Sequence, residues 1–262
     1  MQTTTTQAVI FDIGGVLLDG NTPMPGAVEA LARLRQVNMP FLLLTNTTRR
    51  SHADLLAAMH GAGLDVSAQQ LLTPARAAAE WLHTHQTHGV LLIHPGLLPD
   101  FAEVATTPVG QQTETTAPRA VIVGDAGEGF TYTTLNAAFR ELMAGATLIS
   151  LSDSRYFREA DGLSLDAGPF VRLLEEAAGT SSIAMGKPGA PFFQQAIATL
   201  GLPPERITLI GDDVHSDILG AHAVGLQTIL VETGKYQPGD ETHLPEGAGQ
   251  ARNVLAAVEA LS

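Results

Sequence analysis

The stretch Ala8-Val9-Ile10-Phe11-Asp12-Ile13-Gly14-Gly15, near the beginning of the chain, decides the fold class. Four apolar residues in a row are followed by a carboxylate, and two glycines come shortly after it. A short continuous apolar run is typical of a strand that is buried on both faces, as in a parallel sheet. The glycines allow the backbone to turn sharply and to approach a ligand closely. We therefore expect a buried strand that ends at Asp12.

Two later stretches repeat this pattern of an apolar run that ends in small polar or acidic residues. They are Phe41-Leu42-Leu43-Leu44 before Thr45-Asn46, and Ile207-Thr208-Leu209-Ile210 before Gly211-Asp212-Asp213. Helix-like segments follow the first two strands, at 26–36 and 51–61. Alternating strands and helices predict a doubly wound, Rossmann-like α/β core with a parallel sheet. In such sheets ligands bind beyond the carboxyl ends of the strands, where the three polar clusters would lie.

The middle of the chain predicts a second α/β unit with strands and helices of its own. Strand candidates are 90–93, 120–123 and 147–150, and helix candidates are 133–143 and 168–178. The stretch 106–118, rich in Thr, Gln and Pro, predicts a surface loop. If the polar clusters before and after this unit belong to one site, the unit is an insertion. The core domain would then consist of 1–74 and 182–262, with 75–181 inserted.

Composition excludes several classes of protein. The 262 residues include 27 acidic and 14 basic side chains, which gives a formal net charge of −13, and there is no Cys. The acidic balance argues against nucleic acid and anionic membranes as partners. The absence of Cys rules out disulfides and thiolate chemistry. No stretch is apolar enough to span a bilayer, and the first seven residues do not resemble a signal peptide, so we expect a cytoplasmic protein.

Asp12 is a candidate nucleophile or metal ligand, because it follows a predicted strand and precedes exposed amides. Some enzymes form an aspartyl-phosphate on such a carboxylate. Taken alone, an Asp-x-Gly-Gly segment is more often a turn or a cap, since short motifs match frequently by accident.

Two further segments offer groups that suit a phosphoryl ligand. Thr45 and Asn46 supply a hydroxyl and an amide for phosphate oxygens, with an N-cap as the alternative. Lys187, in Gly186-Lys187-Pro188, supplies a point charge suited to a phosphate or to a carboxylate nucleophile. The alternative for a lone Lys is an exposed surface charge.

The strongest single signal is the group of carboxylates at Asp212, Asp213 and Asp217. A hard divalent cation relieves their mutual repulsion, and Mg²⁺ commonly takes one or two carboxylates together with phosphate oxygens. The alternative is a solvated acidic start of a helix, where negative charge suits the helix dipole.

The order Asp, Thr-Asn, Lys, Asp-Asp along the chain resembles the haloacid dehalogenase superfamily of phosphohydrolases, whose four signature motifs all have a counterpart here. The insertion after the second motif resembles the branch with a large α/β cap domain. The resemblance runs nearly end to end and is strongest to phosphatases that take phospholysine, phosphohistidine or pyrophosphate. The segments that carry it are 11–17, 91–94, 125–130, 186–188, 210–213 and 233–236.

The resemblance implies a role for each candidate. Asp12 would attack phosphorus, Thr45 and Asn46 would hold the phosphoryl oxygens, and Lys187 would balance their charge. Mg²⁺ would bind Asp12, the backbone carbonyl of Gly14 and Asp212, with Asp213 as a further candidate ligand. These roles fit an in-line phosphoryl transfer through an aspartyl-phosphate, which water then hydrolyses.

Gly14 departs from the pattern of most of the superfamily, which has a second Asp two residues after the nucleophile as general acid and base. Positioned acid–base catalysis is worth about 10²–10⁴-fold in rate. Its loss hurts most with a poor leaving group such as an alkoxide, so the sequence favours phosphoramidates or pyrophosphate. Asp19 is nearby in sequence as another proton source, although capping of a turn is the more frequent role.

Two other segments are weighed against simpler interpretations. His83, His85 and His88 invite a metal site, but no carboxylate lies among them and a helix end is favoured. The glycine-rich stretch 124–130 resembles a cap loop that shapes specificity. Its Asp125 and Glu128 would meet a cationic substrate group, with a polar turn as an equal alternative.

Three functions therefore stay open. The leading hypothesis is a Mg²⁺-dependent phosphatase of small phosphorylated compounds. The alternatives are a general small-molecule phosphomonoesterase of the same superfamily and a phosphate-binding regulatory protein with weak turnover, an interpretation that Gly14 keeps open and Asp12 argues against. The resemblance also favours a homodimer formed through the cap.

Overall fold

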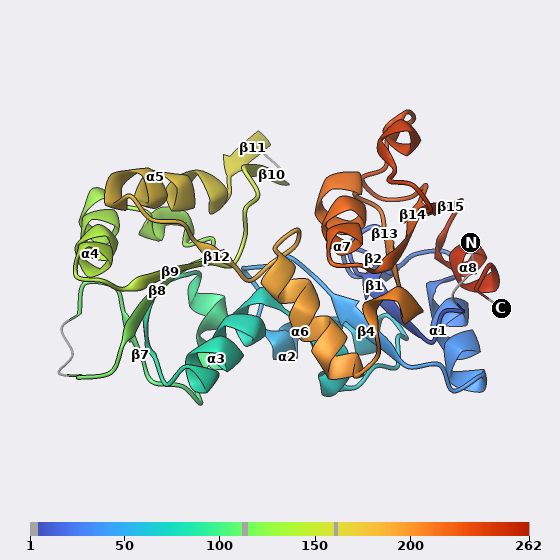
Figure 1. The fold of residues 1–262 in the computed structure, drawn as a ribbon, viewed down its shortest axis with the longest axis horizontal. Coiled ribbons are helices and arrows are strands. Elements are labelled where there is room, and N and C mark those ends of the chain that lie inside the picture. The colour runs from blue at the N-terminus through green and yellow to red at the C-terminus, as the bar shows by residue number, and fades with distance from the viewer. Residues whose placement is uncertain (1–4, 112–114, 160–161, 262) are drawn as a thin grey trace. The chain divides into compact units, whose positions relative to one another are not determined.

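The computed structural model describes residues 5–111, 115–159 and 162–261, which form two compact units (Figure 1). One unit, here called the core unit, contains Met1–Thr45, Ala53–Leu72 and Lys187–Ser262. The other, here called the inserted unit, contains Asn46–His52 and Thr73–Gly186. This division differs from the predicted boundaries chiefly at Asn46–His52, which packs with the inserted unit although it follows a strand of the core unit.

The core unit is built on a six-stranded parallel sheet with the order β15-β14-β13-β1-β4-β5. In this sheet β1 lies between β13 and β4, and Phe11 is in register with Ile210 on one side and Leu43 on the other. The three strands predicted from apolar runs are therefore neighbours, and the residues that follow them lie at one edge. The strands are β1 (Ala8–Asp12), β4 (Phe41–Leu44), β5 (Leu71–Leu72), β13 (Ile207–Gly211), β14 (Gln227–Val231) and β15 (Gly249–Ala251).

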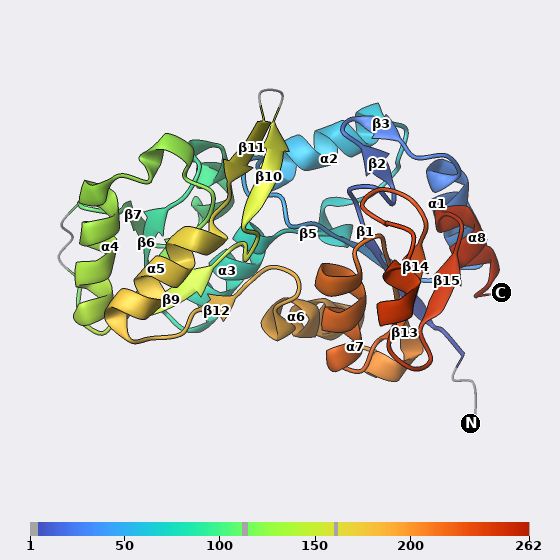
Figure 2. The ribbon, with the colours of Figure 1, turned by 90° about the horizontal axis from the view of Figure 1, so that it is seen from above.

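Helices of the core unit pack against this sheet. Helices α1 and α8 lie side by side in both views (Figures 1 and 2) and bury one face each, including Leu31 and Leu34 of α1 and Val258 of α8. These side chains join Phe11 of β1 in one apolar cluster, which holds the strand that ends at the site. The helices are α1 (Ala27–Gln36), α2 (His52–Gly61), α6 (Ala190–Leu200), α7 (Gly220–Ala223) and α8 (Val254–Glu259), with a π-helical turn, η5 (Val214–Leu219), before α7.

Short elements complete the core unit. A small antiparallel hairpin of β2 (Leu18–Asp19) and β3 (Thr22–Pro23) follows the first strand. Three short 3₁₀ turns, η1 (Ala68–Gln70), η4 (Pro204–Arg206) and η6 (Asp240–His243), connect the larger elements.

The inserted unit has a five-stranded parallel sheet of its own with the order β12-β9-β8-β6-β7, so the expectation of a second α/β unit is confirmed. Helices α4 and α5 lie on one face of this sheet and α3 on the other (Figure 1). Its strands are β6 (His88–Leu92), β7 (Thr106–Pro108), β8 (Arg119–Val123), β9 (Thr147–Ser150) and β12 (Ile183–Ala184), with a separate hairpin of β10 (Tyr156–Glu159) and β11 (Gly162–Leu165). Its helices are α3 (Pro74–Thr84), α4 (Tyr132–Met143) and α5 (Gly168–Ala178), with 3₁₀ turns η2 (Pro95–Phe101) and η3 (Gly127–Gly129).

One element of the inserted unit was wrongly predicted. The stretch 106–118 was expected to be a loop throughout, but Thr106–Pro108 forms the edge strand β7 beside β6. An edge strand tolerates Pro108 because its outer side needs no backbone donor, and Thr favours strands, so composition alone misled the prediction. Residues 112–114 of this stretch lie outside the described residues.

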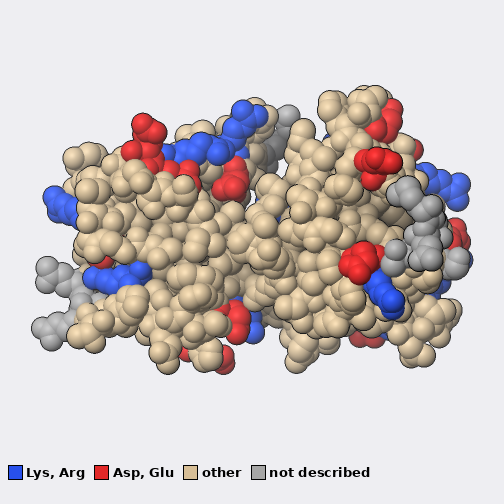
Figure 3. Space-filling view, in the orientation of Figure 1, with Lys and Arg blue, Asp and Glu red and all other residues tan. Residues whose placement is uncertain are grey.

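Charged side chains on the face in Figure 3 are dispersed among uncharged ones, and Lys and Arg stand there in small separate groups. Within the described ranges, no helix is both long and apolar enough to cross a membrane.

Candidate active site

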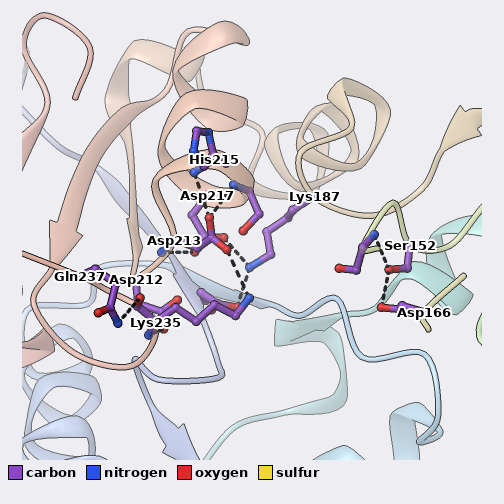
Figure 4. A network of polar contacts seen from close by, with 12 residues as sticks. Ser152, Asp166, Lys187, Asp212, Asp213, His215, Asp217, Lys235 and Gln237 are labelled. Carbon is purple, nitrogen blue, oxygen red and sulfur yellow. Dashed lines mark hydrogen bonds and ion pairs between the residues drawn. The ribbon is translucent and has the colours of Figure 1, made fainter. Parts of the chain in front are cut away.

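Asp12 and Lys187 meet at the carboxyl edge of the core sheet. Asp12 is the last residue of β1, and Lys187 lies in the turn between β12 and α6. The Lys187 Nζ donates a hydrogen bond of 2.6 Å to Asp12 Oδ1. It also lies 2.6 Å from Asp217 Oδ1 (Figure 4). All three residues are buried, and Asp217 is fully inaccessible to solvent. The sequence prediction that joined Asp12 to Lys187 is thus consistent with a direct contact.

The charge of Lys187 is stabilised by these two carboxylates. Burial opposes the ammonium form, but the charges of Asp12 and Asp217 outweigh it and raise the pKa of Lys187 above its ordinary value. The side chain is therefore a fixed positive charge at neutral pH.

Asp12, Asp212 and Asp217 bring carboxylate oxygens within 4.8 Å of one another. Burial, followed by the charges of Asp12 and Asp217, raises the pKa of Asp212 to about 8. Burial also raises the pKa of Asp217 to about 6, although the charge of Lys187 opposes this. Three carboxylates that are hard to ionise together form an arrangement that a cation stabilises.

The donor set fits a hard divalent cation. Asp212 Oδ1 is buried and has no hydrogen-bond partner among the described residues, which is costly unless another ligand satisfies it. The other oxygen, Oδ2, accepts a hydrogen bond of 2.7 Å from the backbone N–H of Lys235. Carboxylate oxygens are the ligands that Mg²⁺ takes in proteins, so this cluster suits such an ion.

Asp213 has a different contact from the one expected. Its Oδ1 accepts hydrogen bonds from the backbone N–H groups of His215 and Ser216, so it caps η5. Its Oδ2 lies 3.3 Å from Lys235 Nζ, and it is not part of the acidic cluster. The third carboxylate of the acidic cluster belongs to Asp217, one helical turn further along. An interpretation of Asp213 as the N-cap of the following turn would have favoured Asp217.

The remaining predicted residues are placed as follows. Gly14 is exposed, and a Cβ at this position would meet no atom within 4 Å. Thr45 follows β4 directly and is buried in the core unit. Asn46 belongs to the inserted unit, so its role toward a phosphoryl group stays a prediction. The same holds for the carbonyl of Gly14.

Asp125, for which a contact with a cationic substrate and a polar turn were equal alternatives, has a charged partner within its own unit. It is buried and forms an ion pair with Arg49 within the inserted unit. The guanidinium of Arg49 also lies 4.4 Å from the ring centroid of Phe157. In the same unit, Ser152 donates to Asp166 (Figure 4), where burial raises the pKa of that carboxyl. The charged partner of Asp125 is therefore Arg49, a residue of the same unit.

The histidines of the inserted unit form structural contacts. His85 stacks on Trp81 with ring centroids 4.1 Å apart, at the end of α3. His88 begins β6, and its Nε2 lies 3.1 Å from the hydroxyl of Thr107. His83 and His85 thus lie at the end of α3, whereas His88 lies in a strand.

Comparison with known proteins agrees with this fold and site. A sequence profile described as haloacid dehalogenase-like hydrolase matches residues 9–105, and a second HAD-like profile matches residues 184–259. The human phospholysine phosphohistidine inorganic pyrophosphate phosphatase is 37% identical over 97% of this chain and 94% of its own length. The haloacid dehalogenase-like hydrolase domain-containing protein 2 of Pongo abelii is 41% identical over 90% of this chain and 87% of its own length.

A solved structure supports the same conclusion for the fold. The p-nitrophenyl phosphatase from Archaeoglobus fulgidus superposes with a TM-score of 0.87 over 98% of this chain and 99% of that one, at 23% identity. The chain therefore belongs to the haloacid dehalogenase-like hydrolases, and it is a phosphatase of that family.

Proposed function

We propose that this phosphatase is a Mg²⁺-dependent phosphohydrolase that forms an aspartyl-phosphate on Asp12. Its substrates are small phosphoryl compounds with a good leaving group, such as the phosphoramidates phospholysine and phosphohistidine, or pyrophosphate. The observation that carries the proposal is the buried contact of Lys187 with Asp12, in a cluster of carboxylates at the edge of the sheet. The name of the human relative, which mentions these three substrates, supports it further.

In the proposed reaction a carboxylate oxygen of Asp12 forms a bond to phosphorus while the bond to the leaving group breaks. Lys187 offsets negative charge on Asp12 and on the phosphoryl oxygens, because its ammonium forms ion pairs with both Asp12 and Asp217. Water then attacks the phosphoryl group, which releases inorganic phosphate and regenerates Asp12. Thr45, and Asn46 as the resemblance implies, hold the phosphoryl oxygens.

The carboxylates of Asp12, Asp212 and Asp217 would hold Mg²⁺, with the Gly14 carbonyl as the further ligand that the resemblance implies. When bound, the ion supplies positive charge that stabilises the phosphoryl oxygens in the transition state. Asp213 supports the site through Lys235 instead of as a ligand.

Gly14 narrows the class of substrate. Gly14 has no side chain, and a Cβ there would meet nothing within 4 Å. This position therefore supplies no acid to protonate the leaving group. The leaving group of pyrophosphate is phosphate, which is a stable anion. In a protonated phosphoramidate the leaving nitrogen already carries the proton that it needs. The leaving group of an alkyl phosphate is an alkoxide, which needs a proton from an acid. Without that acid, its hydrolysis lacks the rate factor of about 10²–10⁴ that positioned acid–base catalysis supplies.

A substrate panel with purified protein and Mg²⁺ tests the proposal. We expect kcat/KM to be higher for imidodiphosphate and pyrophosphate than for glycerol phosphate and other alkyl phosphates. Faster hydrolysis of the alkyl phosphates would contradict the substrate class and indicate a general phosphomonoesterase. No phosphate release from any P–O, P–N or pyrophosphate substrate would contradict the enzyme activity itself.

A further inference from the structure

The loop after β14 holds one oxygen of Asp212 in a slot made of backbone. Asp212 Oδ2 accepts a hydrogen bond of 2.7 Å from the backbone N–H of Lys235. The backbones of Gly15 and Gly234 lie close to each other and to this oxygen. Figure 4 shows Asp212 beside Lys235, close to Asp213.

Neither glycine in this slot can be replaced without a collision. A Cβ on Gly15 would lie 2.1 Å from Asp212 Oδ2, and a Cβ on Gly234 would lie 1.9 Å from the same atom. Each Cβ would also lie 2.6 Å from the Cα of the other glycine. Both residues have positive φ, at +76° and +62°, which also favours glycine. The carboxylate therefore lies where side chains would otherwise be.

Thr233 ties the two sides of the slot together. Its hydroxyl donates a hydrogen bond of 2.6 Å to the backbone carbonyl of Gly15, although 218 residues separate them. The chain that follows β1 and the chain that follows β14 are thus connected next to Asp212.

The second oxygen of Asp212 has a different environment. Oδ1 is buried and has no hydrogen-bond partner within the described part of the chain. The Asp212 carboxylate brings an oxygen within 4.8 Å of carboxylate oxygens of Asp12 and Asp217. Fixing Oδ2 decides where Oδ1 points. Groups that orient a metal ligand from behind in this way typically change metal affinity or activity by 10–100-fold when they are removed.

We propose that Gly15, Thr233 and Gly234 form a backbone clamp that fixes Asp212 Oδ2 and so presents Oδ1 to the divalent cation. Thr233 and Gly234 are then positioning residues for cation binding, which sequence analysis named only through a resemblance of the segment 233–236. This inference rests on the proposed Mg²⁺ dependence of the site.

Gly234→Ala tests the clamp, with Gly201→Ala as its matched control. Gly201 ends α6 in the same unit, has a φ of +65°, and a Cβ there would meet nothing within 4 Å. The two substitutions impose a similar backbone penalty, but only that at Gly234 displaces Asp212. We expect calorimetric titration of the metal-free protein to show Mg²⁺ affinity reduced about 10–100-fold in Gly234→Ala and unchanged in Gly201→Ala.

Thr233 supplies a second test, in case Gly234→Ala fails to fold. Thr233→Val keeps the shape and removes the donor, and we expect Mg²⁺ affinity to fall about twofold to tenfold, as the loss of one hydrogen bond predicts. Thr233→Ser restores the hydroxyl and should restore the affinity. The Mg²⁺ concentration for half-maximal activity should rise in Thr233→Val, while kcat at saturating Mg²⁺ falls much less.

Three results would overturn the clamp. The first is wild-type affinity in both Gly234→Ala and Thr233→Val. The second is an equal loss in Gly234→Ala and Gly201→Ala, which would indicate general backbone strain. The third is a loss in Thr233→Val that Ser does not restore. Absence of Mg²⁺ binding by the unmutated protein would contradict the proposed function as well, and so separates the two failures.

Discussion

Lys187 Nζ lies 2.6 Å from Asp12 Oδ1, although the two residues are 175 positions apart in the chain. The contact joins the first strand of the core unit to the first residue of the unit's last segment. It also gives Asp12, which is almost wholly buried, the positive partner that a buried carboxylate needs. The same ammonium reaches Asp217, so removing it leaves two buried acids without their counter-charge.

Lys187→Met should therefore impair both stability and catalysis. Breaking a buried ion pair by removing one partner costs about 3–5 kcal/mol, and loss of one electrostatic group at the reacting centre costs about 10²–10³ in kcat. Urea unfolding and phosphate release measure the two effects. Lys235→Met is the control for stability, because its ammonium is largely exposed and should contribute at most about 1 kcal/mol. Equal stability of Lys187→Met and Lys235→Met would contradict a stabilising role of the buried ion pairs of Lys187.

The metal-free protein should become less stable as the pH rises from 5 to 8.5. The folded state raises the pKa of Asp212 to about 8 and that of Asp217 to about 6, mainly through burial, from an ordinary value of 3.8. A raised carboxyl pKa means that the folded state binds more protons than the unfolded state, so stability falls between the two pKa values. Asp212→Asn should flatten this dependence, measured by urea unfolding in EDTA at several pH values. If the free energy of unfolding of the unmutated protein depends on pH as little as that of Asp212→Asn, the pKa of Asp212 is not raised in the folded state.

The same ionisation predicts the pH dependence of metal stabilisation. A bound ion stabilises the fold in proportion to the logarithm of its concentration over Kd. Because Mg²⁺ requires ionised carboxylates, the rise in Tm at a fixed Mg²⁺ concentration should be larger at pH 8 than at pH 6. A rise that is the same at both pH values would show that Asp212 and Asp217 are not the ligands.

Gly14→Asp should widen the range of substrates. A Cβ at this exposed position would meet nothing within 4 Å, so we expect the fold to accommodate the substitution. We expect hydrolysis of alkyl phosphates to rise at least about tenfold, within the 10²–10⁴ that positioned acid–base catalysis is worth. Gly14→Asn has the same size without the acid and serves as the control. If both variants match the unmutated protein on alkyl phosphates, the missing acid does not limit the substrate.

Much of the core unit could be predicted from the sequence because its strands are continuous apolar runs that end in polar residues. The edge at which Asp12, Thr45 and Asp212 lie follows from that pattern and from the geometry of parallel sheets. Asp213 could not be distinguished from Asp217 in this way, since the choice depends on which carboxylate caps the helical turn. The role proposed for Gly234 could not be predicted either, because it depends on a tertiary contact with Asp212.

The inserted unit was less predictable in its side chains than in its strands. For Asp125 the sequence left a contact with a cationic substrate and a polar turn equally open, and in the structure it pairs with Arg49 from a segment 76 residues earlier. The sequence does not indicate such a long-range ion pair. The segment that contains Arg49 comes directly after a core strand, so it was assigned to the core unit, and its packing with the inserted unit was missed.

Arg49→Leu should destabilise the inserted unit. It leaves the buried carboxylate of Asp125 without its charged partner, and a lost partner of a buried polar group costs about 1–3 kcal/mol. Arg33→Leu is the matched control, because Arg33 pairs with the exposed residues Glu29 and Glu259 and should cost at most about 1 kcal/mol. Addition of Asp125→Asn to Arg49→Leu should recover part of the loss. Urea unfolding checks this, and no recovery would mean that the pair is not the source of the stability.

Asp12→Asn tests the central claim most directly, with Asp19→Asn as the control. Asp19 is the next acidic residue in the chain and is exposed on β2. We predict that Asp12→Asn abolishes Mg²⁺-dependent phosphate release from imidodiphosphate and pyrophosphate while its circular dichroism stays that of the unmutated protein. Asp19→Asn should retain full activity. Phosphate release by folded Asp12→Asn at the rate of the unmutated protein would contradict a mechanism through an aspartyl-phosphate on Asp12.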